Sequence, residues 1–341
     1  MNSLPRWSTL ELVGVALLCS ILLTMWLTPL SMRLARAAGV VDMPHERRVH
    51  KKPTPRWGGL AMYVSFVLTI GILSCFRPSL LYFDGHINGR VVGILFGGFL
   101  ITILGALDDK FSLPAKVKLF GQILAACVLV LPVFGVRMVV FFDMDLISTK
   151  LHHIPAWVEW SGYALTIIWV VAVTNTINLI DGLDGLAAGI AGLAALTFVS
   201  IGVGMKGTYG EAMLAATLAG TCIGFLRYNF YPAQTFMGDA GSHFLGYTIA
   251  ALSVLQNWKV ATGIAFAVPV LILAVPIFDT TFAILRRLRR GQPVFSPDKG
   301  HLHHRLLRLG LNQRVVVLTI YLLTAAGCLL ALLLAHARLW N

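Results

Sequence analysis

The chain has 341 residues, of which 57% are hydrophobic and only 12% are charged. Soluble domains carry roughly 25% charged residues, so this composition excludes an ordinary soluble protein and indicates that lipid surrounds much of the chain. The net charge of +12 does not call for nucleic acid, because basic loops of membrane proteins face anionic headgroups and anionic substrates. The five scattered cysteines contain no Cys-x-x-Cys pair and predict neither a disulfide framework nor a zinc site.

Long apolar segments predict an all-α, polytopic integral membrane protein with about ten transmembrane helices in one domain, 1–341. The predicted spans are 9–31, 57–76, 91–107, 116–134, 159–178, 186–204, 211–230, 241–256, 261–285 and 315–336. We interpret the first as a retained span. A cleaved signal peptide carries its basic residues before the apolar segment, whereas Arg33 and Arg36 follow it here. The stretch 135–158 predicts a short hairpin.

The basic residues predict the orientation of these spans. The loops after the first span and after every second span from there carry 19 of the 27 Lys and Arg residues. By the positive-inside rule these loops face the cytoplasm, and both termini are extracytoplasmic. The cytoplasmic loops are 32–56, 108–118, 178–186, 227–241 and 286–314.

Unusual polar residues from distant segments fall on this one predicted face. Ionisable groups at membrane depth are rare and indicate function. They are Asp108, Asp109, Lys116, Lys118, Asn178, Asp181, Asp184, Asn229, Asp239, Asp279, His301, His303 and His304. Chance could place one cluster there, but all of them together predict a single active site at the cytoplasmic boundary.

Each cluster has a structural alternative. Adjacent Asp108 and Asp109 could simply end a helix, or act as a proton acceptor and a magnesium partner. The segment Asn178-Leu-Ile-Asp181-Gly-Leu-Asp184-Gly could form an Asx turn, or an oxygen-rich cradle for Mg²⁺ and a phosphate.

Three further residues remain open in the same way. Asp239 could cap the helix that follows it and still face a metal. Phe236 could stack on a base or anchor the chain at the membrane interface. Asp279 could serve the site, or pair with a nearby Arg in packing alone.

The last inner loop contains His301-Leu-His303-His304-Arg305, preceded by Lys299. This spacing matches no familiar zinc pattern, although zinc is one alternative. Donors to a diphosphate are the better interpretation, because Arg305 and Lys299 lie beside the histidines.

Together these residues resemble the polyprenyl-phosphate N-acetylhexosamine-1-phosphate transferases over nearly the whole chain. The matching motifs are Leu107-Asp108-Asp109, Asn178-Leu-Ile-Asp181-Gly-Leu-Asp184-Gly-Leu-Ala, Phe236-Met-Gly-Asp239-Ala-Gly-Ser and His301-Leu-His303-His304. The resemblance is closest to the undecaprenyl-phosphate N-acetylglucosamine-1-phosphate branch, because Leu302 interrupts histidines that are consecutive in the lipid I enzyme.

The resemblance implies roles for individual residues. Catalytic roles fall on Asp108, Asp109 and Asp181, and Lys118 is implied to hold the lipid phosphate. The implied magnesium ligands are Asn178 and Asp239, with Mn²⁺ as a second candidate cation. The residues implied to contact the nucleotide or its diphosphate are Lys51, Asp184, Asn229, Phe236, His301, His303, His304 and Arg305.

The implied reaction is Mg²⁺-dependent transfer of N-acetylglucosamine 1-phosphate from a UDP-sugar to undecaprenyl phosphate, which releases UMP and starts a cell-envelope polysaccharide. The partners are then UDP-N-acetylhexosamine, polyprenyl phosphate and membrane lipids, without nucleic acid and with a homodimer as a further expectation. The location is the bacterial cytoplasmic membrane. The alternatives are the UDP-N-acetylmuramoyl-pentapeptide transferase that makes lipid I, a membrane transporter, and a CDP-alcohol phosphotransferase, whose further aspartates are missing here.

Overall fold

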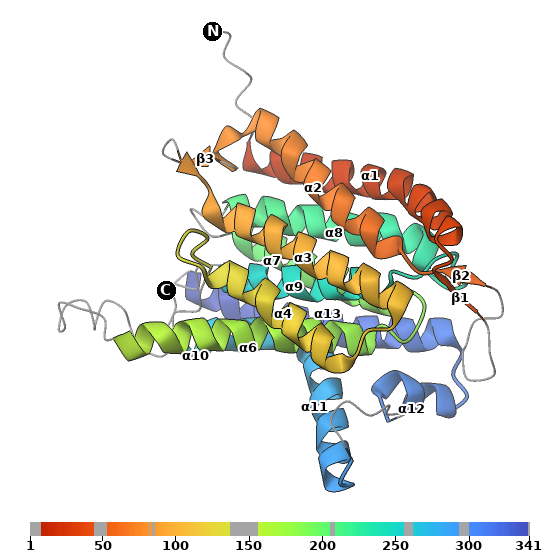
Figure 1. The fold of residues 1–341 in the computed structure, drawn as a ribbon. Coiled ribbons are helices and arrows are strands. Elements are labelled where there is room, and N and C mark those ends of the chain that lie inside the picture. Colours follow the sequence, from red (N-terminus) through yellow and green to blue (C-terminus); the bar gives the residue numbers. More distant parts are fainter. Residues whose placement is uncertain are drawn as a thin grey trace.

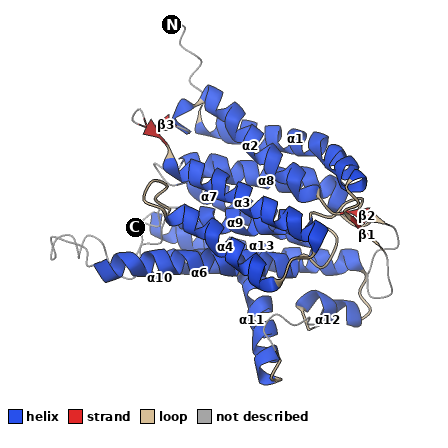
Figure 2. Ribbon diagram, in the orientation of Figure 1, coloured by secondary structure: helices blue, strands red, loops and turns tan. Residues whose placement is uncertain are grey.

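The structure, a computed structural model, describes residues 8–43, 53–80, 82–83, 86–136, 156–204, 209–255, 262–292 and 300–339. These residues are mostly helical, which confirms the predicted all-α class (Figure 1, Figure 2). The strands among them form two short antiparallel pairs, β1 (Val41–Asp42) with β2 (Thr54–Pro55) and β3 (Tyr82–Phe83) with β4 (His86–Ile87). Most of the hairpin predicted at 135–158 lies outside the described residues.

The helices follow the predicted spans in order. They are α1 (Thr9–Ala37), α2 (Gly58–Phe76), α3 (Gly89–Phe111), α4 (Ala115–Val130), α6 (Ala156–Ile180), α7 (Leu186–Gly204), α8 (Tyr209–Asn229), α9 (Gly238–Leu255), α10 (Thr262–Ile272), α11 (Ala274–Arg289), α12 (Leu302–Arg308) and α13 (Gln313–Leu339). In the described part of the chain, seven helices are long and apolar enough to cross a membrane, namely α1, α2, α3, α6, α7, α8 and α13. This confirms several membrane-spanning helices, while the total of ten stays a prediction.

The segment 261–285, predicted as one span, forms two helices that meet at Leu273. Pro276 explains the break, because proline has no backbone N–H to donate to the carbonyl four residues earlier and its ring clashes there. The second helix, α11, departs from the common direction of the other long helices (Figure 1).

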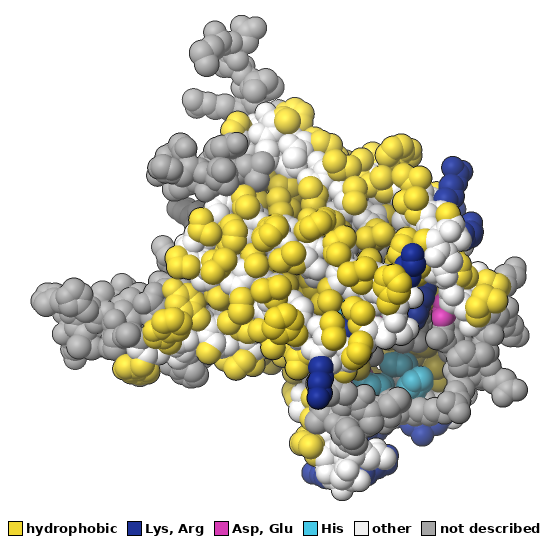
Figure 3. Space-filling model, in the orientation of Figure 1, with side chains coloured by type: hydrophobic (Ala, Val, Ile, Leu, Met, Phe, Trp, Pro, Cys, Tyr) yellow, Lys and Arg dark blue, Asp and Glu magenta, His cyan; other side chains and the backbone are white. Residues whose placement is uncertain are grey.

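Large apolar side chains cover the flank of the bundle, as Figure 3 shows. Leu22, Trp26, Phe120 and Leu322 are between 66% and 73% exposed on α1, α4 and α13. Exposed apolar area on this scale is typical of a surface that contacts lipid. Basic and histidine side chains instead gather toward one end of the molecule in the same view. On this face, basic and histidine side chains therefore gather toward one end of an apolar bundle.

Helix α9 lies at the centre of the bundle, packed against α2, α3, α6, α7 and α8. Its residues from 240 to 253 are all buried. Helix α3 approaches the start of α9 so closely that a methyl group at Gly105 would overlap the backbone of Asp239. The absence of a side chain at Gly105 therefore lets α3 and α9 meet closely at the polar end of the bundle.

Both ends of the described chain lie on the side opposite the β1–β2 pair. Helix α1 begins, and α13 ends, at the same end of the bundle (Figure 1). Which side of a membrane this is stays a prediction.

Candidate active site

A cavity of about 320 Å³ opens at the polar end of the bundle. Its lining comes from the segment before α2, the end of α3, the α3–α4 connection, the start of α4, α6 and α9. The lining residues are Arg56, Asp108, Asp109, Ser112, Leu113, Lys118, Asn178 and Asp239. Five of them are residues that the sequence placed in the active site, four from three separate motifs and the fifth being Lys118.

Asp108 lies where α3 ends, a position at which the helix dipole disfavours a negative charge. Three local features accommodate it. Ser112 adopts a left-handed conformation with φ of 53°, which turns the chain back toward the helix end. The amide of Leu113 then donates to Asp108 Oδ1 at 2.7 Å, and Lys118 Nζ lies 3.0 Å from Asp108 Oδ2.

Asp109, in contrast, contacts the N-terminus of a different helix, α9. Its Oδ1 accepts the backbone amide of Asp239 at 2.9 Å, and its Oδ2 accepts that of Ala240 at 3.3 Å. These amides begin α9, so Asp109 caps that helix from α3 and its charge meets the positive end of the α9 dipole. Gly238, with φ of +68°, makes the turn into α9 beside the Asp109 carboxylate. The adjacent aspartates thus have different surroundings and different partners.

Asp239 contacts two polar side chains at the floor of the cavity. Its Oδ2 lies 3.2 Å from Lys118 Nζ, so this lysine bridges Asp108 and Asp239. Its Oδ1 accepts a hydrogen bond of 3.0 Å from Asn178 Nδ2, which also donates to Ser242 Oγ at 2.8 Å. Residues far apart in the chain therefore converge on the predicted metal ligands.

The oxygen atoms around the cavity fit a magnesium ion. Among the described residues no three His, Cys, Asp or Glu side chains form a ready-made metal cluster. Mg²⁺ does not need one, because it commonly uses one or two protein oxygens and completes its shell with waters and substrate phosphates. Asp239 and the side-chain oxygen of Asn178 would supply that kind of partial site, and no cysteine lines the cavity.

Asp181 lies in the turn between α6 and α7, directly after the last turn of α6, which carries Asn178. Burial, with added repulsion from the charges of Asp239 and Asp109, raises the pKa of Asp181 to about 8. A carboxyl group whose pKa is raised to near neutral pH in this way is typical of a site that binds a cation or transfers a proton.

The histidine motif lies next to this turn. His303 is 2% exposed, and a methyl group at Gly182 would lie 2.7 Å from its Nε2. His301 Nδ1 lies 2.8 Å from Asp279 Oδ2, and the amide of Leu302 donates to Asp279 Oδ1 at 2.8 Å. Asp279 thus holds the start of α12 and contacts His301. The alternative from the sequence was that Asp279 pairs with a nearby arginine in packing alone.

The rings of the motif are close to one another. The centroids of His301 and His303 are 5.7 Å apart with nearly parallel planes, and those of His303 and His304 are 4.3 Å apart. Burial, with the neighbouring His304 and His301, lowers the pKa of His303 to about 4, so its ring is neutral at pH 7. Arg305 follows on the exposed side of α12.

Asp184 and Asn229 connect the α6–α7 turn to the loop before α9. Asp184 Oδ2 accepts the amide of Ala233 at 3.0 Å, and Asn229 Oδ1 accepts that of Gly185 at 3.1 Å. Asn229 is 2% exposed, so its observed contacts are internal to the protein. Its predicted place beside the nucleotide stays a prediction.

Phe236 lies in the same loop, where its backbone amide donates to Pro55 O at 2.8 Å and its carbonyl accepts the amide of Gly58 at 3.0 Å. This pairing joins the segment before α2 to the segment before α9. Lys51, the other predicted nucleotide contact, lies outside the described residues.

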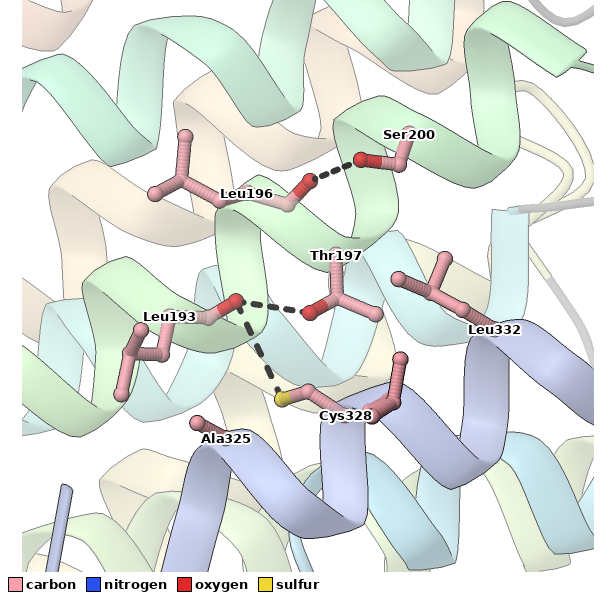
Figure 4. Close-up of a pocket in the computed structure, with 8 residues that line it drawn as sticks. Leu193, Leu196, Thr197, Ser200, Ala325, Cys328 and Leu332 are labelled. Carbon is pink, nitrogen blue, oxygen red and sulfur yellow. Dashed lines mark hydrogen bonds between the residues drawn. The ribbon is translucent and has the colours of Figure 1, made fainter. Parts of the chain in front are cut away.

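A second cavity, of about 210 Å³, lies between α7 and α13 (Figure 4). The hydroxyl groups of Thr197 and Ser200 turn back onto their own helix, to Leu193 O at 2.8 Å and Leu196 O at 3.1 Å. Its remaining lining is apolar apart from Cys328. This groove lacks charged groups, so the polar cavity is the candidate active site.

Residues 91–257, which include α3, α4, α6, α7, α8 and α9, match the glycosyl transferase family 4. A probable undecaprenyl-phosphate N-acetylglucosaminyl 1-phosphate transferase from Bacillus subtilis is 42% identical over 328 residues, covering 96% of this chain and 86% of that protein. The chain belongs to the polyprenyl-phosphate N-acetylhexosamine-1-phosphate transferase family.

Two other relatives of this transferase family have similar coverage. A decaprenyl-phosphate N-acetylglucosaminephosphotransferase from Mycolicibacterium smegmatis is 37% identical over 92% of this chain and 79% of that protein. An undecaprenyl-phosphate alpha-N-acetylglucosaminyl 1-phosphate transferase from Escherichia coli K12 is 30% identical over 88% of this chain and 77% of that protein. The family predicted from the motifs is confirmed.

The transferase motifs do not account for the whole cavity. Arg56 and Ser112 line it without having been predicted as site residues. Arg56 ends a basic segment whose lysines attracted the prediction, and Ser112 has no distinctive signal because its position depends on the left-handed turn after α3. Such residues are found only when the helices are assembled.

Proposed function

We propose that this protein transfers N-acetylglucosamine 1-phosphate from UDP-N-acetylglucosamine to undecaprenyl phosphate and releases UMP. The observation that carries the proposal is the cavity in which Lys118 bridges Asp108 and Asp239 beside Asn178. It lies at the end of an apolar bundle, where a water-soluble nucleotide sugar and a lipid whose tail lies in the bilayer can meet. The names and extensive identity of the relatives support the same substrates.

The cationic side chains of the cavity suit the acceptor. Lys118 and Arg56 are the Lys and Arg residues of its lining, facing three carboxylates. A lipid phosphate entering the cavity would take Lys118 as a partner and would need its own charge neutralised. Asp108 and Asp239 hold the lysine in place until then.

The amide and carboxylate side chains of the cavity suit the donor. Asn178 and Asp239 would hold Mg²⁺, and bound Mg²⁺ neutralises charge on the diphosphate and stabilises the departing UMP. His303, placed against Gly182 beside Asp181, offers a neutral ring to the diphosphate. The turn that carries Asp181 therefore links the metal ligands to the histidine motif.

The chemical step is an in-line displacement at the β-phosphorus of the nucleotide sugar. An oxygen of the lipid phosphate forms the new bond to this phosphorus while the bond to the bridging oxygen of UMP breaks. The lipid phosphate is already anionic near neutral pH, so the protein's main contributions are positioning and charge neutralisation. Both oxygens of Asp109 are engaged in capping α9, which disfavours it as a covalent nucleophile. Asp108 and Asp181 are the remaining carboxylates for the covalent alternative.

The orientation follows from charge. Nineteen of the 27 Lys and Arg residues fall in the loops on the cavity side, which supports a cytoplasmic active site in the bacterial inner membrane. The lipid-linked sugar phosphate made there would start a cell-envelope polysaccharide.

Purified protein with Mg²⁺ and undecaprenyl phosphate should release UMP from UDP-N-acetylglucosamine. Omission of the lipid phosphate is the control for simple hydrolysis. Preference for UDP-N-acetylmuramoyl-pentapeptide would instead indicate the lipid I reaction. Uptake of the nucleotide sugar into proteoliposomes without a lipid product would favour transport, which the position of the charged groups at one end of the bundle disfavours.

A further inference from the structure

A second layer of polar side chains lies one helical turn beyond the cavity, inside the bundle. Gln122 follows Lys118 by four residues on α4, His243 follows Asp239 by four on α9, and Asn175 precedes Asn178 by three on α6. Residues three or four apart share a face of a helix. Lys118, Asp239 and Asn178 therefore each have a polar neighbour one turn deeper on the same helix. Gln122, Asn175 and His243 form this inner layer.

The inner layer is connected across three helices. Asn175 Nδ2 donates to Gln122 Oε1 at 2.6 Å, and Gln122 Nε2 donates to Asn175 Oδ1 at 3.3 Å. Gln122 Nε2 also lies 3.3 Å from His243 Nε2. Gln122 is 2% exposed and His243 is 1% exposed. Hydrogen bonding between these side chains thus fixes α4, α6 and α9 relative to one another.

His243 is the member of the layer nearest Asp239, with no hydrogen bond between the two side chains. Its Nε2 lies 4.0 Å from Asp239 Oδ2, the oxygen that Lys118 also contacts. Because Gln122 Nε2 donates to His243 Nε2, the proton of the neutral ring lies on Nδ1. Among the described residues Nδ1 has no hydrogen-bond partner, although it is buried.

Two explanations compete for buried polar groups of this kind. Asn, Gln and His often hydrogen-bond across membrane helices only to hold them together. A purely cohesive network would be expected to satisfy its polar atoms, and an orphaned buried nitrogen calls for another explanation. Each member also lies one helical turn from a cavity residue, which favours a role in supporting the cavity over cohesion alone.

We propose that Gln122, Asn175 and His243 are positioning residues, which hold Lys118, Asn178 and Asp239 in the arrangement that binds the lipid phosphate and a divalent cation. The inference rests on the proposed function of those three cavity residues. Outer partners of metal ligands typically contribute 10–100-fold to metal affinity or activity. The inner layer should contribute on the same scale without touching either substrate.

The test compares His243→Leu and Gln122→Leu with a matched control, Ser253→Ala. Trp169 Nε1 donates to Ser253 Oγ at 2.9 Å, a buried bond between the same helices α6 and α9 but away from the cavity. Electron paramagnetic resonance measures Mn²⁺ affinity in the presence of UMP. Steady-state kinetics gives kcat and the KM for undecaprenyl phosphate, and thermal unfolding is measured without ligands.

The two leucine variants should bind Mn²⁺ about 10-fold more weakly and raise the KM for lipid phosphate by a similar factor. Ser253→Ala should lower the unfolding temperature without changing either quantity. His243→Gln, which keeps an acceptor for Gln122, should recover part of the loss. Unchanged Mn²⁺ affinity in both leucine variants, or an equal loss in Ser253→Ala, would overturn the inference.

The double variant Gln122→Leu/Asn175→Leu covers the case in which single variants unfold. Replacing both amides by apolar groups avoids an unpaired buried amide but leaves His243 without Gln122, so the unfolding temperature should recover in part. Mn²⁺ affinity should stay weakened, and recovery of both would mean that the layer only holds helices together. Absence of Mn²⁺ binding by the unaltered protein would also overturn the inference. Normal Mn²⁺ effects without UMP release from UDP-N-acetylglucosamine would contradict the proposed function alone.

Discussion

Asn178 Nδ2 donates a hydrogen bond of 3.0 Å to Asp239 Oδ1, across 61 residues of sequence. This contact joins the end of α6 to the start of α9 and places both predicted metal ligands at one point of the cavity wall. Asp109 caps the same turn of α9, and Lys118 reaches it from α4. The site is thus assembled from helix ends, where backbone amides and side chains together accommodate the negative charges.

Asp239→Asn tests the predicted metal ligand. The amide can keep the hydrogen-bonding shape of the carboxylate but removes the charge that a divalent cation needs. We expect transfer to fall by at least ~100-fold, the upper end of the loss seen for outer partners of metals. Glu11→Gln, in the exposed capping box of α1, makes the same chemical change far from the cavity and should leave the rate unchanged. Full activity of Asp239→Asn at saturating Mg²⁺ would refute the assignment.

Asp181→Asn tests whether the charge of Asp181 destabilises the protein when no ligand is bound. Because its folded pKa is raised to about 8 from an ordinary value of 3.8, the protonated form stabilises the fold at low pH, and this stability is lost as pH rises toward 8. The asparagine variant does not titrate. Its advantage in apparent unfolding temperature over the unaltered protein should therefore grow between pH 4 and 8, while transfer is lost. A constant difference across that range would contradict the raised pKa.

His303→Gln tests the neutral histidine. The folded pKa of His303 is about 4, below the ordinary 6.5, so its contribution to stability is present above pH 6.5 and is lost as pH falls toward 4. The variant should show a shallower decline in unfolding temperature over that interval, together with slower transfer at pH 7.5. His336→Gln, on the exposed end of α13, is the control. Identical pH profiles for His303→Gln and the unaltered protein would argue against a buried neutral ring.

Gly105→Ala tests the close approach of α3 to α9. The added methyl group would overlap the backbone at Asp239 and push the start of α9 away from Asp109. Overpacking of this kind costs about 1–3 kcal/mol, and the displaced site should also lose activity. Gly71→Ala on α2 meets nothing within 4 Å and should be stabilising by up to ~1 kcal/mol through helix propensity. Chemical unfolding and UMP release measure both effects, and equal behaviour of the two variants would contradict the packing argument.

The helical class and the region of the site could be predicted from sequence because apolar length and misplaced polar residues are local signals. The division of 261–285 at Leu273 could not, although Pro276 lies beside it, because membrane helices often tolerate proline. The different surroundings of Asp108 and Asp109 also could not be predicted from the sequence. They depend on which neighbouring helix end each carboxylate meets, and only the assembled bundle determines that.

Transfer of the phosphorus atom itself tests the central claim most directly. The protein is incubated with Mg²⁺, undecaprenyl phosphate and UDP-N-acetylglucosamine labelled with ³²P at the β-phosphate, and the lipid and aqueous products are separated. The proposed reaction moves the label into the lipid and leaves the released UMP unlabelled. Label that stays in the aqueous phase as UDP would mean that only the sugar had been transferred, and would contradict the account.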